Sequence, residues 1–172
     1  MVSLNDENKD RYMVAIHEAG HCVICYLLGY KFDKALICLG SGSNSDGKFI
    51  RLKSQLNDPK PKDQLGYYEY IKDLVRIILA GGAAVSIFNN SGEIRYLGIE
   101  PDLIQAVNLL KIITDSDSEI KSYLHNLGHE DFLLLHKVEN RRAVDFLAKK
   151  LLEEDVILYE DIIEDLKSCY LN

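Results

Sequence analysis

The sequence predicts one domain, residues 1–172, that is mainly helical and contains a small β element. Apolar residues recur at helical spacing along most of the chain, and the only strand candidates lie between residues 34 and 52. A chain of 172 residues, 47% of them hydrophobic, is close to the usual size of one domain and can bury a core. Because there is also no internal repeat, we expect a single folded unit.

Charge and hydropathy exclude several classes of protein. The net charge is −7 and no stripe of Lys and Arg is present, which argues against nucleic-acid binding. The longest apolar stretches, such as residues 77–85, are far shorter than the roughly 20 residues that span a bilayer. The N-terminus lacks an apolar signal region, and four cysteines are too few for a disulfide framework in a chain of this length. We therefore expect a cytoplasmic protein with no membrane segment.

The first half of the chain predicts two helices on either side of a strand pair. Residues 8–28 carry apolar side chains on one broad side of a helix, and Gly29 suits its end. Two strands are expected at residues 34–39 and 48–52, with polar turn residues between them. A proline-containing linker then leads to a helix over residues 67–88, whose small residues allow close packing against a neighbour.

The second half predicts four helices. The first runs from residue 101 to about residue 114, because proline suits the first helical position. Acidic residues cap a short helix over residues 118–127, and Gly128 is expected to end it. Residues 130–153 and 159–168 form the last two helices.

The segment from His17 to His21 carries the pattern H-E-x-x-H inside the first predicted helix. Since His17 and His21 are four residues apart, they share a face of the helix and can bind one zinc ion. Glu18 is then placed to take a proton from a water molecule that the metal activates for attack on a carbonyl. Gly20 costs roughly 1 kcal/mol relative to Ala inside a helix, which indicates a close backbone approach.

A catalytic zinc site needs a third protein ligand and leaves its fourth position open. The downstream candidates by residue type are Glu93, Glu100, Asp102, His125, His129 and His136. Periodicity does not choose among them, and the three histidines are read most simply as surface or loop residues. Cys22 and Cys25 form a single C-x-x-C, which we interpret as two small apolar core positions because no second pair accompanies them.

Four segments occur in an order that matches a known family. They are RYMVAIHEAGHCVICYLLG with KALICLG, IILAGGAAVSIF, GIEPDLIQAVNLL and RRAVDFLAKKLLEEDVILYEDIIEDL. Together they resemble the zinc peptidase domain of the FtsH-type ATP-dependent metalloproteases over nearly the whole chain. The resemblance implies a helical zincin fold like that peptidase domain, with His17 and His21 as zinc ligands and Glu18 as the catalytic base. It places Asp102 on the third ligand.

The chain departs from the family's pattern beside the site. The family reads G-G-R-A-A-E in its second helix, so Gly82 stands in place of its Arg and Val85 in place of its Glu. That Glu is thought to support the metal site, and losing such support can cost 10–100-fold in affinity or activity. Pro101 replaces the Asn before the ligand Asp. The family's ATPase module has no counterpart, so we expect a stand-alone peptidase domain.

The sequence therefore predicts a zinc metallopeptidase with one zinc ion that cleaves peptides or unfolded protein chains. Residues 48–52 are expected to be an edge strand that pairs with an extended substrate. A separate ATPase partner and a homo-oligomer are both compatible with this reading. The alternative is a degenerate, non-catalytic interaction or regulatory module with the same fold, because Gly82 and Val85 depart from the family's pattern.

Overall fold

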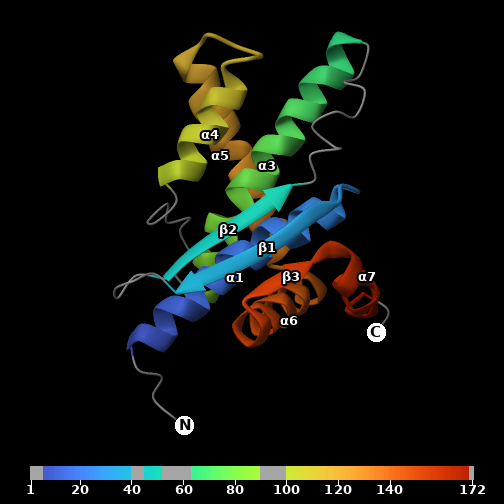
Figure 1. Ribbon diagram of the computed structural model, residues 1–172. Helices are drawn as coiled ribbons and strands as arrows, with labels where there is room; N and C mark the ends of the chain where they lie inside the picture. Colours follow the sequence, from blue (N-terminus) through green and yellow to red (C-terminus); the bar gives the residue numbers. More distant parts are fainter. Residues whose placement is uncertain (1–5, 40–44, 52–62, 90–99, 171–172) are drawn as a thin grey trace.

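Six helices and a three-stranded antiparallel sheet make up the described part of a computed structural model, which covers residues 6–39, 45–51, 63–89 and 100–170 (Figure 1). The predicted fold class, mainly helical with a small β element, is confirmed at this level. No described helix is long and apolar enough to cross a membrane.

Helices α1 (Asp6–Leu27) and α3 (Gln64–Phe88) pack against each other at the centre of the molecule. They approach each other closely at Gly20, where a Cβ atom would lie 2.7 Å from the carbonyl oxygen of Ala80 and 2.7 Å from Cβ of Ala84. Contacts this short leave no room for any side chain at residue 20. The close backbone approach expected at Gly20 is therefore confirmed, with the small residues of α3 as its partners.

The sheet has the strand order β2-β1-β3, with β1 (Phe32–Leu39) in the middle. It pairs antiparallel with β2 (Ser45–Arg51) and with β3 (Val156–Leu158). The two predicted strands are present, and β2 is an edge strand of the described sheet. The third strand was not predicted, because three residues are too few to show a strand period.

The main difference between the predicted and observed helices of the second half concerns the end of α5. Helix α5 (Asp117–Leu135) continues through Gly128, so the expectation that this glycine ends a helix is wrong. Gly128 is buried inside α5, and tertiary packing outweighs the roughly 1 kcal/mol that glycine costs in a helix. The break lies instead at residues 136 and 137, before α6 (Val138–Glu154).

Helix α4 (Glu100–Leu110) begins one residue before Pro101, close to its predicted start, and ends earlier than expected. Helix α7 (Tyr159–Ser168) has the predicted bounds.

Two clusters of buried apolar side chains form the core of the described part of the chain. The larger lies between α1, α3, α6, α7 and the sheet, and it includes Cys22 and Cys25, so the interpretation of this pair as core residues is confirmed. The smaller joins α3 to α4 and α5 at the other end of the molecule (Figure 1). Because α3 contributes to both clusters, it holds α1 and α4 in fixed positions relative to each other.

Candidate metal centre

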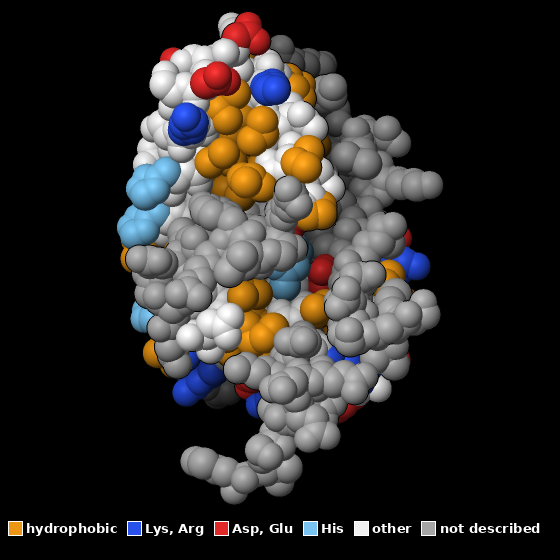
Figure 2. Space-filling view, turned by 90° about the vertical axis from the view of Figure 1, so that its left-hand side faces the viewer, with side chains coloured by type: hydrophobic (Ala, Val, Ile, Leu, Met, Phe, Trp, Pro, Cys, Tyr) orange, Lys and Arg blue, Asp and Glu red, His pale blue; other side chains and the backbone are white. Residues whose placement is uncertain are grey.

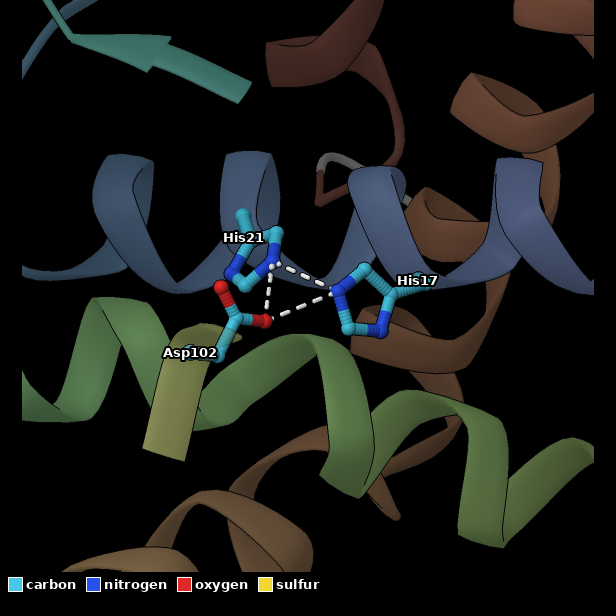
Figure 3. A group of neighbouring side chains, drawn as sticks. All are labelled: His17, His21 and Asp102. Atoms are coloured by element: carbon cyan, nitrogen blue, oxygen red, sulfur yellow. Dashed lines mark hydrogen bonds and ion pairs between the residues drawn. The ribbon is translucent and has the colours of Figure 1, made fainter. Parts of the chain in front are cut away.

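Three side chains from two distant segments of the chain meet beside α3 (Figure 3). His17 and His21 project from α1, and Asp102 projects from the first turn of α4. Nε2 of His17 lies 3.0 Å from Nε2 of His21 and 3.0 Å from Oδ2 of Asp102. The remaining separation, from Nε2 of His21 to Oδ2 of Asp102, is 3.5 Å. The three potential ligand atoms therefore surround one point.

The helix period explains why these side chains converge. His17 and His21 share a face of α1 because they are one turn apart. On α4, Asp102 lies on the same face as Ala106 and Leu110, which follow it by four and eight residues. Ala106 and Leu110 are fully buried in the cluster that joins α4 to α3. Docking this face of α4 therefore turns Asp102 toward the two histidines.

The spacing of the three atoms fits a tetrahedral metal ion. Zinc bonds to nitrogen and oxygen are about 2.0–2.1 Å long, so two ligand atoms at a tetrahedral angle lie roughly 3.3 Å apart. The separations of 3.0, 3.0 and 3.5 Å lie on either side of that value. Three protein ligands leave one coordination position for water or substrate, which is the arrangement of catalytic rather than structural zinc sites.

A hydrogen bond to a carbonyl group of α3 orients one of the rings. Nδ1 of His21 lies 2.7 Å from the carbonyl oxygen of Ile77. A carbonyl oxygen can only accept a hydrogen bond, so Nδ1 carries the proton and donates it. Nε2 of His21 is then the ring nitrogen that faces His17 and Asp102, and in the neutral ring its lone pair is free to bind a metal.

The electrostatics of the three residues also suit a cation. Burial alone would raise the pKa of Asp102, but hydrogen bonds from His17 and His21 outweigh it and hold the pKa well below its usual value. Burial lowers the pKa of His17, which favours the neutral ring. Burial also acts to lower the pKa of His21, but its interactions with Asp102 and Glu18 raise the pKa above its usual value. The group therefore attracts one positive charge, which a metal ion can supply in place of a proton.

Glu18 is almost completely buried, with 4% of its surface exposed. Its Oε2 atom has no hydrogen-bond partner among the described residues. Burial raises the pKa of Glu18 to about 7, while His21 lowers it and Asp102 raises it further. The side chain is not one of the three grouped ligands. It is therefore a carboxyl group beside the three candidate ligands that can exchange a proton near neutral pH.

The other candidates for a third ligand are not in this group. His125, His129 and His136 are exposed, and histidine side chains line one edge of the face shown in Figure 2. Glu93 and the side chain of Glu100 lie outside the described residues. Within the described residues, His17, His21 and Asp102 are the single group of three side chains that could together hold a metal ion.

Two residues of α3 that support the histidines were not identified from the sequence. Ile77 accepts the hydrogen bond from His21, and Gly81, one turn later, lies against the ring of His17. No pattern points to a backbone carbonyl such as that of Ile77. The pair Gly81-Gly82 inside a predicted helix was a usable signal, because each glycine costs roughly 1 kcal/mol there. Val85, where the family has its supporting Glu, is half-buried and offers no polar side-chain atom.

No protein-family model matches the chain. A search of curated proteins likewise found no match.

Proposed function

We propose that this protein is a zinc-dependent metallopeptidase, similar to the peptidase domain of the FtsH-type proteases. The observation that carries the proposal is the convergence of His17, His21 and Asp102 at separations of 3.0 to 3.5 Å, with the buried carboxyl of Glu18 next to His17 in the chain. Imidazole nitrogens and a carboxylate oxygen are the ligands of a catalytic zinc ion. The H-E-x-x-H pattern supports the same reading.

Each residue has a distinct role in this proposal. Bound zinc would supply a Lewis acid that activates a water molecule and polarises the carbonyl of the scissile peptide bond. His17, His21 and Asp102 would hold the ion, and the hydrogen bond from His21 to Ile77 would fix the ring that binds it. Glu18 would accept the proton that the attacking water loses and then deliver it to the nitrogen of the departing amine. The proton is thereby returned, and Glu18 is unchanged at the end of the reaction.

The substrates would be peptides and unfolded chains. As an edge strand, β2 has one side without a partner among the described strands, and an extended peptide can pair with such an edge through backbone hydrogen bonds. Backbone pairing selects extended chains with little sequence preference. Folded domains expose few such segments, so a separate ATPase partner would be needed to present them.

A second candidate is a non-catalytic interaction or regulatory module with the same fold. Val85 favours it, since a valine cannot give the polar support that the family's Glu is thought to provide. Metal analysis of the purified protein together with a casein-cleavage assay separates the two. About one zinc per chain and cleavage that a chelator abolishes support the enzyme. Absence of cleavage by the zinc-loaded protein supports the module.

A further inference from the structure

The imidazole of His17 lies against the backbone of α3 at Gly81. A Cβ atom added to Gly81 would be 2.6 Å from Cε1, 2.7 Å from Nδ1 and 2.7 Å from Nε2 of that ring. Because the three distances are nearly equal, the added atom would lie over the face of the ring rather than beyond its edge. The ring therefore occupies the space that a side chain at residue 81 would need.

The size of this conflict can be compared with the tolerance of a metal site. Ordinary contacts of a Cβ atom begin at 3.4 Å, so the ring would have to retreat by about 0.8 Å from its distance of 2.6 Å. Metal–ligand distances must be correct to within about 0.2 Å. A retreat of this size would therefore remove Nε2 of His17 from the point that it shares with His21 and Asp102.

The two histidines are held by residues that are themselves one helical turn apart. His21 contacts Ile77 and His17 contacts Gly81, so α3 runs antiparallel to α1 here and offers one support per turn. The support for His21 is a hydrogen bond to a carbonyl group, whereas the support for His17 is a flat contact with a backbone that has no side chain. The identity of residue 81 therefore affects one ring of the pair directly.

We propose that Gly81 is a positioning residue of the metal site, which sets the place of the His17 ring by its lack of a side chain. The role in metal binding rests on the proposed function, whereas the contact between Gly81 and the ring exists without a metal. A purely structural role, in which glycine only lets α1 and α3 approach each other, is the competing explanation.

A thermodynamic cycle on the metal-free protein tests the contact. Gly81→Ala is made in the wild-type chain and in a His17→Ala chain, and the melting temperatures are measured in the presence of a chelator. In the wild-type chain we expect a drop of about 5 °C or more, because a methyl group and a ring compete for one space. In the His17→Ala chain we expect no drop, because the space is free and alanine favours a helix more than glycine does.

Equal drops in both chains would overturn the proposal, since the added methyl group would then conflict with the helix packing and not with the ring. The Gly81→Ala chain could also fail to fold unless His17 is replaced by Ala as well. That result supports the proposal in the same way as a larger decrease in melting temperature in the wild-type chain than in the His17→Ala chain.

Metal binding gives the second measurement. Gly81→Ala should lower zinc affinity about tenfold or more and change the visible absorption of bound cobalt(II), which reports coordination geometry. Ile87→Val is the control, because it shortens a buried side chain of the same helix six residues after Gly81 and should lower stability without changing zinc affinity. Wild-type affinity and spectrum in Gly81→Ala would overturn the proposal. If the wild-type protein binds no zinc, the proposed function is wrong, and the metal-free cycle still decides whether Gly81 positions the ring.

Discussion

The Nδ1 atom of His21 donates a hydrogen bond to the carbonyl oxygen of Ile77, 2.7 Å away and 56 residues later in the chain. The carbonyl belongs to the interior of α3, so it is as rigid as the helix itself. The ring of His21 is 5% exposed and cannot turn without losing this bond. Helix α3 contributes no candidate ligand, but through this bond it sets the direction in which Nε2 of His21 points.

The contacts of α3 with α1 and α4 make the candidate site rigid. Helix α3 contacts α1 at Gly20 and supports both histidine rings, and on its other side it holds the face of α4 that presents Asp102. Ligand atoms on two helices thus take their places from a third helix. Sites built on packed helices hold their geometry more closely than sites built on loops.

The first prediction concerns the proposed base. Glu18→Gln keeps the size of the side chain but removes the group that accepts a proton, so casein cleavage should fall by about 100-fold or more. Zinc content should stay near one ion per chain, because Glu18 is not among the three grouped ligands. The two measurements are made on one preparation. Cleavage at the wild-type rate would show that another group is the base.

The second prediction concerns the third ligand. Asp102→Asn should weaken zinc binding by more than about 100-fold, because loss of a ligand costs more than loss of a supporting group. The rise in melting temperature that zinc gives the wild-type protein should disappear with it. Glu93→Gln and Glu100→Gln are the controls and should keep wild-type affinity. If Asp102→Asn keeps wild-type zinc affinity and either Glu variant loses it, Asp102 is not the third ligand.

The sequence predicted the local part of the site and left the long-range part open. The spacing of His17 and His21 requires a shared helix face, so any reading of that segment as a helix brings the two rings together. Asp102 follows His17 by 85 residues, and its place depends on how Ala106 and Leu110 dock on α3. Residue types alone could not choose it from six candidates, and the family resemblance was needed.

The errors in the fold have a common cause. Gly128 and β3 were misjudged because packing from distant segments overrides or creates local structure there. The buried face of α5 against α3 keeps Gly128 helical, and β3 is a strand because β1 is present to pair with it. A prediction from neighbouring residues in the sequence cannot detect either packing partner, α3 for α5 or β1 for β3.

A third prediction follows from Asp131, a fully buried residue of α5. Burial raises the pKa of its carboxyl group to about 7, although Nε of Arg76 donates a hydrogen bond to Oδ1 over 2.9 Å and lowers it. In the unfolded chain the pKa is about 4. As pH rises between these two values, the unfolded chain loses its proton first, so this carboxyl group makes the protein less stable.

Urea unfolding of the wild type and of Asp131→Asn, from about pH 4 to about pH 8, isolates this effect. We expect the free energy of unfolding of the wild type to fall relative to that of the variant as pH rises, by on the order of 1 kcal/mol or more. Glu18, whose pKa is also about 7, titrates in both proteins and cancels in the comparison. A difference that does not change with pH would show that folding does not raise the pKa of Asp131.

The last prediction concerns the end of α6. Asp155 follows the helix with a left-handed backbone, φ +60°, which is strained for a residue with a side chain. Its carboxylate pairs with Arg11 of α1, and the same guanidinium lies 3.4 Å from the carbonyl oxygen of Leu152 in the last turn of α6. A charged side chain from α1 thus caps α6, and the strain at Asp155 is offset by the ion pair.

Three substitutions separate the contribution of the ion pair from that of the backbone strain. Asp155→Ala loses the ion pair and keeps the strain, so the free energy of unfolding in urea should fall by about 1 kcal/mol. Asp155→Gly loses the same ion pair but removes the strain, so its stability should lie within about 0.5 kcal/mol of the wild type. Arg11→Ala gives the contribution of the cation, and in an Arg11→Ala chain Asp155→Gly should become stabilising. If Asp155→Ala and Asp155→Gly lower the stability equally, the left-handed backbone stores no strain, and the ion pair alone stabilises the junction between α6 and β3.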